Sequence, residues 1–261
     1  MAEKILLFGS CCSLELGWLC CTFIPAMRYK AYERHWDKVV AVIPRQYNYL
    51  CQDFVTDFEH HDKRGSKDRW LLNGKKVPVP KKIRRKYPGA VYYQPSAAKC
   101  CKWQRKAIRY GTFKKDLVYD IVIHARAERK YGQSKWNYPK KKYEKVLKEF
   151  QGLRVCSVGT RAYHIPGTED MRNIPLEQLC NIFRSSKVLV GSSSGPMHLG
   201  SYCGIQHVVI TDNSWQKSID ATNADRYSHI WNPLGTPCKV LQKNNWHPPT
   251  KKVVRAIKRF L

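Results

Sequence analysis

Short apolar runs alternate with longer segments of helical periodicity along most of this chain. The runs 39–43 and 121–123 are continuous and rich in β-branched residues, which is typical of strands buried on both faces. The pattern predicts strands over residues 4–9, 38–44, 119–124, 154–159, 187–191 and 207–211. It predicts helices over residues 16–33, 47–58, 139–150, 176–185, 195–203 and 250–261. This alternation favours an α/β protein with parallel sheets and crossover helices.

The alternation breaks between residues 60 and 102. Four prolines and three glycines interrupt this stretch, which we interpret as an irregular basic insertion. The sequence therefore predicts two α/β domains. The first spans residues 1–116 and carries the insertion, and the second spans residues 117–261 and ends in a basic amphipathic helix.

Positive charge is the strongest signal in the composition. The formal net charge is +27, and residues 62–148 hold 27 Lys and Arg against 6 Asp and Glu, a net charge of +21. Such a concentration favours a polyanionic partner, because each neutralised phosphate releases counterions. An anionic membrane surface or an acidic glycan is the alternative. The cations that we predict to contact nucleic acid are Lys81, Lys82, Arg84, Arg85, Lys86, Lys102, Arg105 and Lys106.

The cysteines and the hydropathy indicate a cytoplasmic protein. The 11 cysteines are odd in number, include adjacent pairs and form no CxxC motif, so we expect reduced, mostly buried thiols rather than disulfides or zinc ligands. The chain has no apolar run of 18 residues, and its first residues lack the features of a secretory signal.

Three predicted strand ends carry residues suited to a phosphate ligand, since ligands of α/β sheets bind at the carboxyl ends of strands. The first is a Ser/Gly turn in which Pro196 opens a helix. Backbone amides and hydroxyls there suit a diphosphate. Another follows the strand that ends at His124, and the loop at Gly159 is a further loop at the same edge of the sheet. The residues that we predict to hold the ligand are His124, Arg126, Arg129, Gly159, Thr160, Ser192, Ser193, Ser194, Gly195, Pro196, Met197 and His198.

Residues 193–199, Ser-Ser-Gly-Pro-Met-His-Leu, followed by Cys-Gly-Ile-Gln-His-Val-Val, resemble the donor-site signature of heptosyltransferase-like GT-B glycosyltransferases. Residues 14–18, Leu-Glu-Leu-Gly-Trp, resemble the first loop of the same family. The resemblance implies two Rossmann-type domains facing a cleft, with the acceptor on the first and a nucleotide sugar on the second. Ser193 stands where the family has an Asp, and Trp18 stands where heptosyltransferases have their catalytic Asp. Glu15, which matches an acid of a broader group of related transferases, is therefore our candidate base.

The sequence thus predicts a glycosyltransferase that moves a sugar from a nucleotide-sugar donor to a hydroxyl of nucleic acid, foremost a 5-hydroxymethylpyrimidine in DNA. The reaction would resemble that of viral DNA glucosyltransferases, and the protein would then work in the host cytoplasm. We expect no metal requirement, because Arg side chains and a helix dipole would stabilise the departing diphosphate. Two alternatives stay open. One is a lipid-linked or polymeric glycan acceptor, and the other is a non-catalytic nucleic-acid-binding protein on the same fold.

Overall fold

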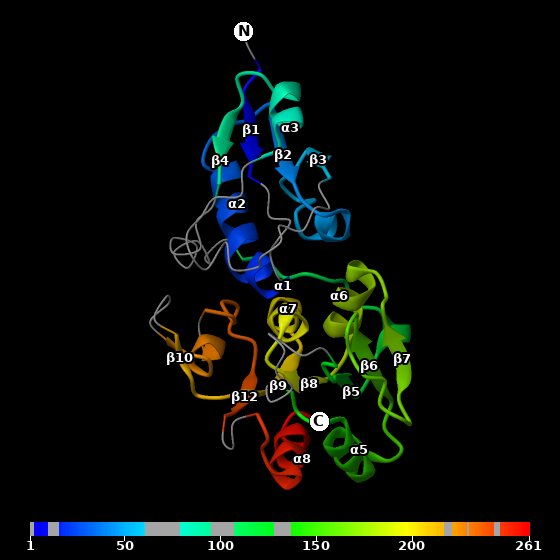
Figure 1. Cartoon of the computed structure of the whole chain (residues 1–261). Helices are drawn as coiled ribbons and strands as arrows, with labels where there is room; N and C mark the ends of the chain where they lie inside the picture. Colours follow the sequence, from blue (N-terminus) through cyan, green and yellow to red (C-terminus); the bar gives the residue numbers. More distant parts are fainter. Residues whose placement is uncertain are drawn as a thin grey trace. The chain divides into compact units, whose positions relative to one another are not determined.

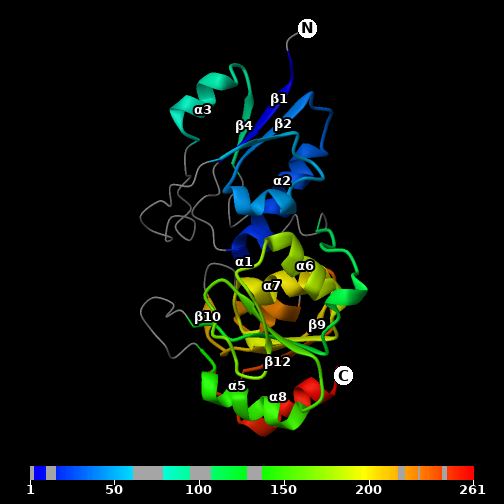
Figure 2. The same ribbon diagram turned by 90° about the vertical axis from the view of Figure 1, so that its right-hand side faces the viewer.

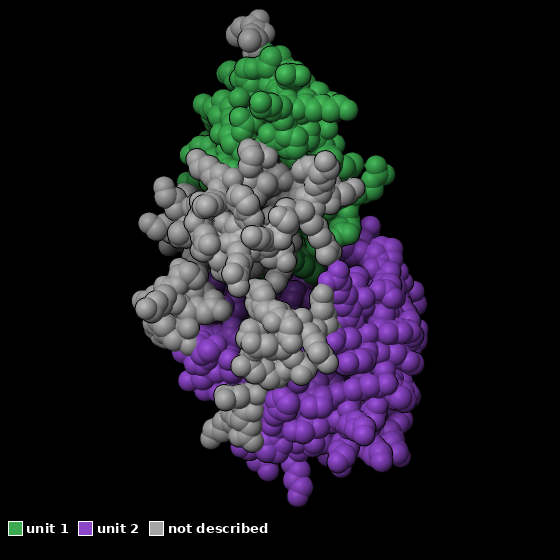
Figure 3. All heavy atoms as spheres, viewed as in Figure 1, with its two compact units in different colours: residues 1–107 green, residues 108–261 purple. Residues whose placement is uncertain are grey.

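The computed structural model describes residues 3–9, 16–60, 79–94, 107–127, 137–216, 221–228, 230–242 and 246–261 (Figure 1). The chain forms two compact units, Met1–Ala107 and Ile108–Leu261, which Figure 3 distinguishes by colour. Each unit is built on a parallel sheet, which confirms the predicted α/β class. The units divide between residues 107 and 108, whereas the sequence places the boundary after residue 116.

The first unit contains a four-stranded sheet in the order β3-β2-β1-β4, and every neighbouring pair is parallel. Its strands are β1 (Ile5–Phe8), β2 (Lys38–Val42), β3 (Asp57–Glu59) and β4 (Val91–Tyr93). Its helical segments are α1 (Leu16–Trp18), the π-helix η1 (Leu19–Phe23), α2 (Ile24–Ala31), the 3-10 helix η2 (Arg45–Leu50) and α3 (Lys81–Lys86). The segment 16–31 is helical, as predicted. Its π turn comes just before Pro25, which supplies no backbone donor to the regular ladder.

The predicted helix over residues 47–58 is wrong. Only η2 forms there, and β3 replaces the end of the predicted helix. The buried guanidinium of Arg28 explains the break, because it donates to the carbonyl of Leu50 (3.3 Å) and makes two bonds to the carboxylate of Asp53 (2.7 and 3.0 Å). Thr56 then pairs with the backbone of Val39 and draws the chain into the sheet. These tertiary bonds outweigh a local helical preference.

The predicted insertion is also more regular than expected, because residues 79–94 form α3 and β4. Ile83 is the buried residue of α3, and it packs with Ile5 and Leu7 of β1. β4 joins the sheet as the parallel neighbour of β1. Residues 61–78 and 95–106 of the predicted insertion lie outside the described ranges. The prolines and glycines masked this short helix and strand in the sequence pattern.

The second unit contains a six-stranded parallel sheet in the order β12-β9-β8-β5-β6-β7. Its strands are β5 (Ile121–His124), β6 (Val155–Gly159), β7 (Glu169–Arg172), β8 (Val188–Ser192), β9 (Gln206–Ile210) and β12 (Cys238–Leu241). The sequence predicts the four central strands, and it misses the two edge strands β7 and β12. An edge strand buries little, so its apolar pattern is weak. A two-stranded antiparallel ribbon, β10 (Trp215–Gln216) and β11 (Ala221–Thr222), lies apart from this sheet.

Helices cover both faces of the six-stranded sheet. α6 (Leu176–Ser185) and α7 (Gly195–Cys203) lie over one face, and α5 (Lys140–Leu147) and α8 (Thr250–Lys258) lie over the other (Figure 2). Short 3-10 turns are η5 (Lys115–Leu117), η7 (Lys148–Phe150) and η8 (Asp225–Ser228). The core under α5 and α8 joins Ile121, Ile123, Val190 and Val208 of the strands to Val253 and Ile257 of α8. α5 to α8 all match predicted helices.

The cysteines that the structure describes fit the prediction of reduced, mostly buried thiols. The seven described cysteines are free thiols, and all of them except Cys238 are buried. Burial raises the pKa of the Cys238 thiol to about 12, so this group stays protonated at neutral pH. No helix in the described ranges is both long enough and apolar enough to cross a bilayer.

Candidate functional site

The Ser/Gly turn of the second unit lies between β8 and the N-terminus of α7, as the sequence predicts. Ser194 is the residue before the first turn of α7, and Pro196 lies within that turn. The first amides of a helix have no intrahelical acceptor, and Pro196 has no N–H. The N–H groups of Gly195 and Met197 are therefore available to an anion, with the positive end of the helix dipole behind them. Ser194 makes no side-chain capping bond to these amides.

Ser193 is held in place from three directions. Its amide donates to the carbonyl of Ile210 (2.8 Å), and its own carbonyl accepts a hydrogen bond from Nη1 of Arg126 (3.2 Å). Its hydroxyl accepts a bond from the hydroxyl of Tyr227 (2.9 Å). The hydroxyl of the preceding Ser192 accepts a hydrogen bond from the backbone amide of Tyr138 (3.0 Å). Both serines are thus buried anchors of the turn, and Ser194 is the serine closest to solvent.

Arg126 brings the second predicted strand end to this turn. It lies two residues beyond β5, is half-buried, and donates from Nε to Asn137 Oδ1 (2.5 Å) as well as to the turn. Its guanidinium carbon lies 5.8 Å from the ring centroid of Trp246. Residues near 126 and near 195 are therefore neighbours, as the predicted phosphate site requires. An Arg fork beside helix amides suits paired, charge-assisted bonds to a diphosphate.

Several polar atoms of this region have no protein partner. The hydroxyl oxygens of Ser194 and Thr211 and the indole nitrogen of Trp246 are buried, and none has a hydrogen-bond partner among the described residues. The three residues form one neighbourhood, since the amide of Trp246 donates to the carbonyl of Thr211 (3.2 Å) and Thr211 follows β9 directly. Buried polar atoms normally have partners, so such a group beside Arg126 fits a polar ligand.

The topology places this neighbourhood where α/β sheets bind ligands. β5 pairs with β6 on one side and with β8 on the other, so the strand order reverses between β5 and β8. Ligands of open parallel sheets bind outside the carboxyl ends of the strands at such a reversal. Arg126 follows β5, and the turn at Ser193 follows β8. The sheet therefore brings the two predicted segments together at its switch point.

Comparison with solved structures identifies the fold. The chain has a GT-B-like fold. A family 9 glycosyl transferase from Veillonella parvula matches with a TM-score of 0.62 at 11% identity, over 99% of this chain and 97% of that one. The E. coli ADP-heptose lps heptosyltransferase II matches with a TM-score of 0.57 at 12% identity, over 98% of each chain. The E. coli heptosyltransferase WaaC with ADP matches with a TM-score of 0.50 at 11% identity, over 99% of this chain and 100% of that one. No family model and no curated protein sequence matches the chain.

His124, Gly159 and Thr160 lie at the carboxyl ends of β5 and β6. His124 is buried, and its Nδ1 bonds to the carbonyl of Val158 (3.1 Å), so Nδ1 carries the proton. Desolvation lowers the pKa of His124 to about 4 and keeps the ring neutral at pH 7. Gly159 packs directly against this ring, and Thr160 is exposed. His124 supports the strand end with a neutral ring, while its predicted contact to a diphosphate remains a prediction.

His198 belongs to an aromatic cluster that the sequence did not reveal. Its ring stacks on Tyr227 with centroids 5.2 Å apart and lies 4.2 Å from the ring of Trp231. The guanidinium carbon of Arg226 lies 4.5 Å from the ring centroid of Trp231. These partners come from a segment about 30 residues downstream, and no spacing in the sequence links them to the turn. These ring contacts hold His198 in place near the N-terminus of α7.

Glu15, Arg129, Lys102, Arg105 and Lys106 lie outside the described residues. Three other carboxylates of the first unit each have a cationic partner: Asp53 pairs with Arg28, Asp57 with Lys38 and Glu59 with Lys86.

The remaining predicted nucleic-acid contacts lie together on α3. Its cations Lys81, Lys82, Arg84, Arg85 and Lys86 are all exposed. Two of them also contact neighbours within the chain, because Lys86 pairs with Glu59 (3.0 Å) and Arg84 lies over the ring of Tyr92 (4.8 Å). The helix is therefore a small exposed cationic surface of the first unit.

Removing the hydroxyl that holds Ser193 should loosen the turn. We expect Tyr227→Phe to lower the free energy of unfolding by about 1 kcal/mol, because the buried Ser193 hydroxyl loses its partner. Ser193→Ala should cost a similar amount, and the double variant should cost less than the sum of the two. Urea unfolding of the four proteins measures this coupling. Tyr163→Phe, at an exposed tyrosine, is the control and should change nothing. Strict additivity would refute the bond's contribution.

Proposed function

We propose that this protein is a nucleotide-sugar glycosyltransferase of the heptosyltransferase type, with an ADP-linked sugar as the first donor to test. The observation that carries the proposal is the contact of Arg126 with the backbone of Ser193 at the N-terminus of α7. It places a guanidinium, helix amides and an unpartnered serine hydroxyl at the switch point of the sheet. The E. coli heptosyltransferases of the same fold are described with ADP-heptose or ADP, which supports the choice of nucleotide.

The proposed chemistry at this site is binding and charge stabilisation. Sugar transfer breaks the bond between the anomeric carbon and the diphosphate, so negative charge grows on the departing phosphate oxygen. Arg126 and the amides of Gly195 and Met197 would bind that oxygen and its neighbours more strongly as the charge develops. The acceptor hydroxyl must also lose a proton, and Glu15 remains our candidate base. Because fixed positive groups stabilise the leaving group, we propose that the reaction needs no metal.

The proposed acceptor is a lipid-linked or polymeric glycan. This acceptor agrees with the fold better than DNA does, because the structural matches include heptosyltransferases and none of the comparisons supports a DNA-modifying enzyme. A hydroxyl of nucleic acid is the second candidate, and the five exposed cations of α3 favour it. A cationic surface also suits a phosphorylated glycan, so the acceptor has to be tested directly.

Donor binding and turnover test the proposal in one series. We expect calorimetry to detect binding of ADP, and we expect hydrolysis or transfer of ADP-heptose to persist with a chelator present. Guanine and uracil sugar nucleotides test the choice of base, while glycan, hydroxymethylated DNA and unmodified DNA test the acceptor. If no nucleoside diphosphate binds, the proposed site is wrong. If chelation abolishes turnover, the metal-independent mechanism is wrong.

A further inference from the structure

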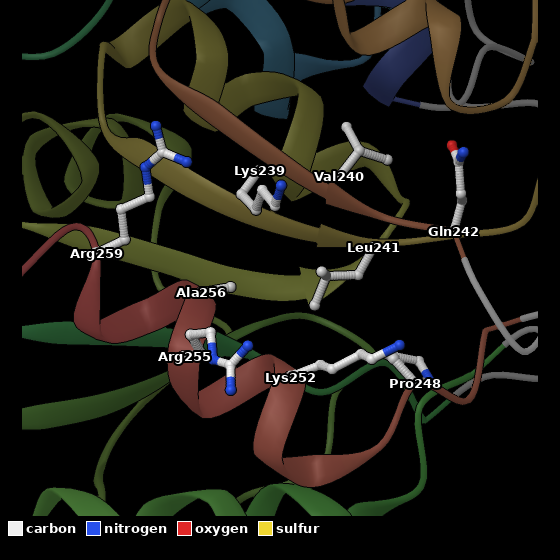
Figure 4. A pocket seen from close by; sticks show the side chains of 9 residues that line it. All are labelled: Lys239, Val240, Leu241, Gln242, Pro248, Lys252, Arg255, Ala256 and Arg259. Carbon is white, nitrogen blue, oxygen red and sulfur yellow. The ribbon is translucent and has the colours of Figure 1, made fainter.

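A basic groove lies between the edge strand β12 and helix α8, on the face of the sheet opposite α7 (Figure 4). Its volume is about 510 Å³, within the range of small-molecule sites. The residues that line it are Lys239, Val240, Leu241, Gln242, Pro248, Lys252, Arg255, Ala256 and Arg259. Four of these nine residues are cations, and none is acidic. We call this feature the β12–α8 groove.

The four cations come from the two elements that form the groove. Lys252, Arg255 and Arg259 come from α8 and the residue just beyond it, at a spacing of three and four residues that places them on one face of a helix. Their positions rise by about 10 Å along the helix axis. Lys239 comes from β12, and Figure 4 shows its side chain on the groove side near Arg259. A chain of anionic groups lying in the groove would meet these cations in succession.

These cations are available to a ligand. All four are exposed, and none forms an ion pair with a carboxylate within the described part of the chain. The floor between them is apolar, with Leu241 and Ala256 at its base. Concentrated positive charge without acidic partners opposes the compact state through self-repulsion, and a bound anion would relieve it.

The apolar face of α8 argues against a membrane as the occupant. Val253, Val254 and Ile257 are buried in the core of the second unit, so they cannot enter a bilayer. Interfacial helices need a free apolar face, and α8 offers a concave cationic surface instead. Three cations along about 10 Å of the helix axis, with Lys239 on the other wall, match phosphate groups better than isolated carboxylates, because phosphates carry more charge per group and accept paired bonds from Arg.

We propose that the β12–α8 groove binds a soluble, chain-like ligand that carries two or more phosphate groups. This site differs from the proposed donor site, because α7 and α8 cover opposite faces of the sheet. The inference does not rest on the proposed glycosyltransferase activity. Its ligand would lie against Lys239 on one wall and Lys252, Arg255 and Arg259 on the other.

A fluorescently labelled short chain of inorganic polyphosphate is the probe, and its affinity for the full-length protein is measured by anisotropy at several salt concentrations. We expect the double variant Lys252→Ala/Arg255→Ala to weaken binding about tenfold near 0.1 M salt and to reduce the salt dependence. Lys239→Ala should weaken binding as well, although it changes the other wall. Circular dichroism and thermal unfolding should be unchanged, since these side chains are exposed.

The matched control is Lys251→Ala/Lys258→Ala. It removes the same charge from exposed positions of the same helix that do not line the groove. We expect it to weaken binding less than about threefold, because the remaining effect is long-range and screened. An equal loss in both double variants would overturn the proposal, since attraction by the whole basic protein would then explain binding. Groove-dependent binding to anionic phospholipid vesicles but not to polyphosphate would also overturn it.

Discussion

Replacement of Arg126 by alanine is expected to lower kcat/KM for sugar transfer or donor hydrolysis by about 100-fold to 1000-fold, the usual loss when one group that stabilises developing charge is removed. Arg126 is the cation that contacts the turn at Ser193 and lies beside the N-terminus of α7. Without it, the departing diphosphate would keep the helix amides and lose the guanidinium. ADP affinity should fall as well, by a smaller factor, because the bound product carries part of the same charge.

Two further variants separate charge from geometry. Arg126→Lys keeps the charge and loses the planar fork, so its activity should lie between those of the wild type and Arg126→Ala. Arg184→Ala removes an exposed arginine of α6 and should leave both turnover and ADP affinity unchanged. Full activity of Arg126→Ala with a folded protein would place the donor phosphates elsewhere. Steady-state kinetics and calorimetry give the two readouts.

Replacement of Gly159 by alanine is expected to destabilise the protein by about 3 kcal/mol, from the sum of backbone strain and overpacking. Gly159 has a φ of +110°, a conformation that side chains disfavour. A Cβ there would lie 2.5 Å from Nδ1 of His124, and that ring is buried and bonded to the carbonyl of Val158. The ring could move aside only by giving up that hydrogen bond. Denaturant unfolding measures the change in free energy.

Gly167 provides the matched control. Its φ of +83° is also positive, but a Cβ there would meet no atom within 4 Å. Gly167→Ala should therefore cost only the backbone strain, about 1 kcal/mol. A similar loss in both variants would mean that the His124 contact adds nothing. Because Arg126 follows His124 by two residues, Gly159→Ala should also weaken ADP binding, and Gly167→Ala should not.

The proposed donor site combines one continuous motif with partners from distant segments. The turn from Ser192 to His198 supplies its own amides and hydroxyls. Asn137 orients Arg126, Tyr227 holds Ser193, and Trp246 lies beside the guanidinium. The hydroxyl bond from Tyr227 occupies Ser193, the position where the resemblance would place an aspartate. A buried carboxylate there would need charge compensation that a tyrosine hydroxyl supplies only in part.

The sequence by itself determined the α/β class, the four central strands of the second sheet and the helices around them. These elements carry their own signal. A strand buried on both faces is continuously apolar, and an amphipathic helix has apolar residues every three to four positions. It also placed the turn at Ser193 and Arg126 at the ends of strands, where serine, glycine and arginine suggested the proposed phosphate site.

The tertiary structure alone decided the rest. The edge strands β7 and β12 depend on a neighbour that supplies hydrogen bonds, and the helix predicted over residues 47–58 gave way to a buried Arg28. The meeting of residues 126 and 193 follows from the order in which β5 and β8 pair. Strand order is set by the packing of whole elements, and no local pattern of residues encodes it. The β12–α8 groove arises in the same way, because an edge strand and the last helix come together only in the folded chain.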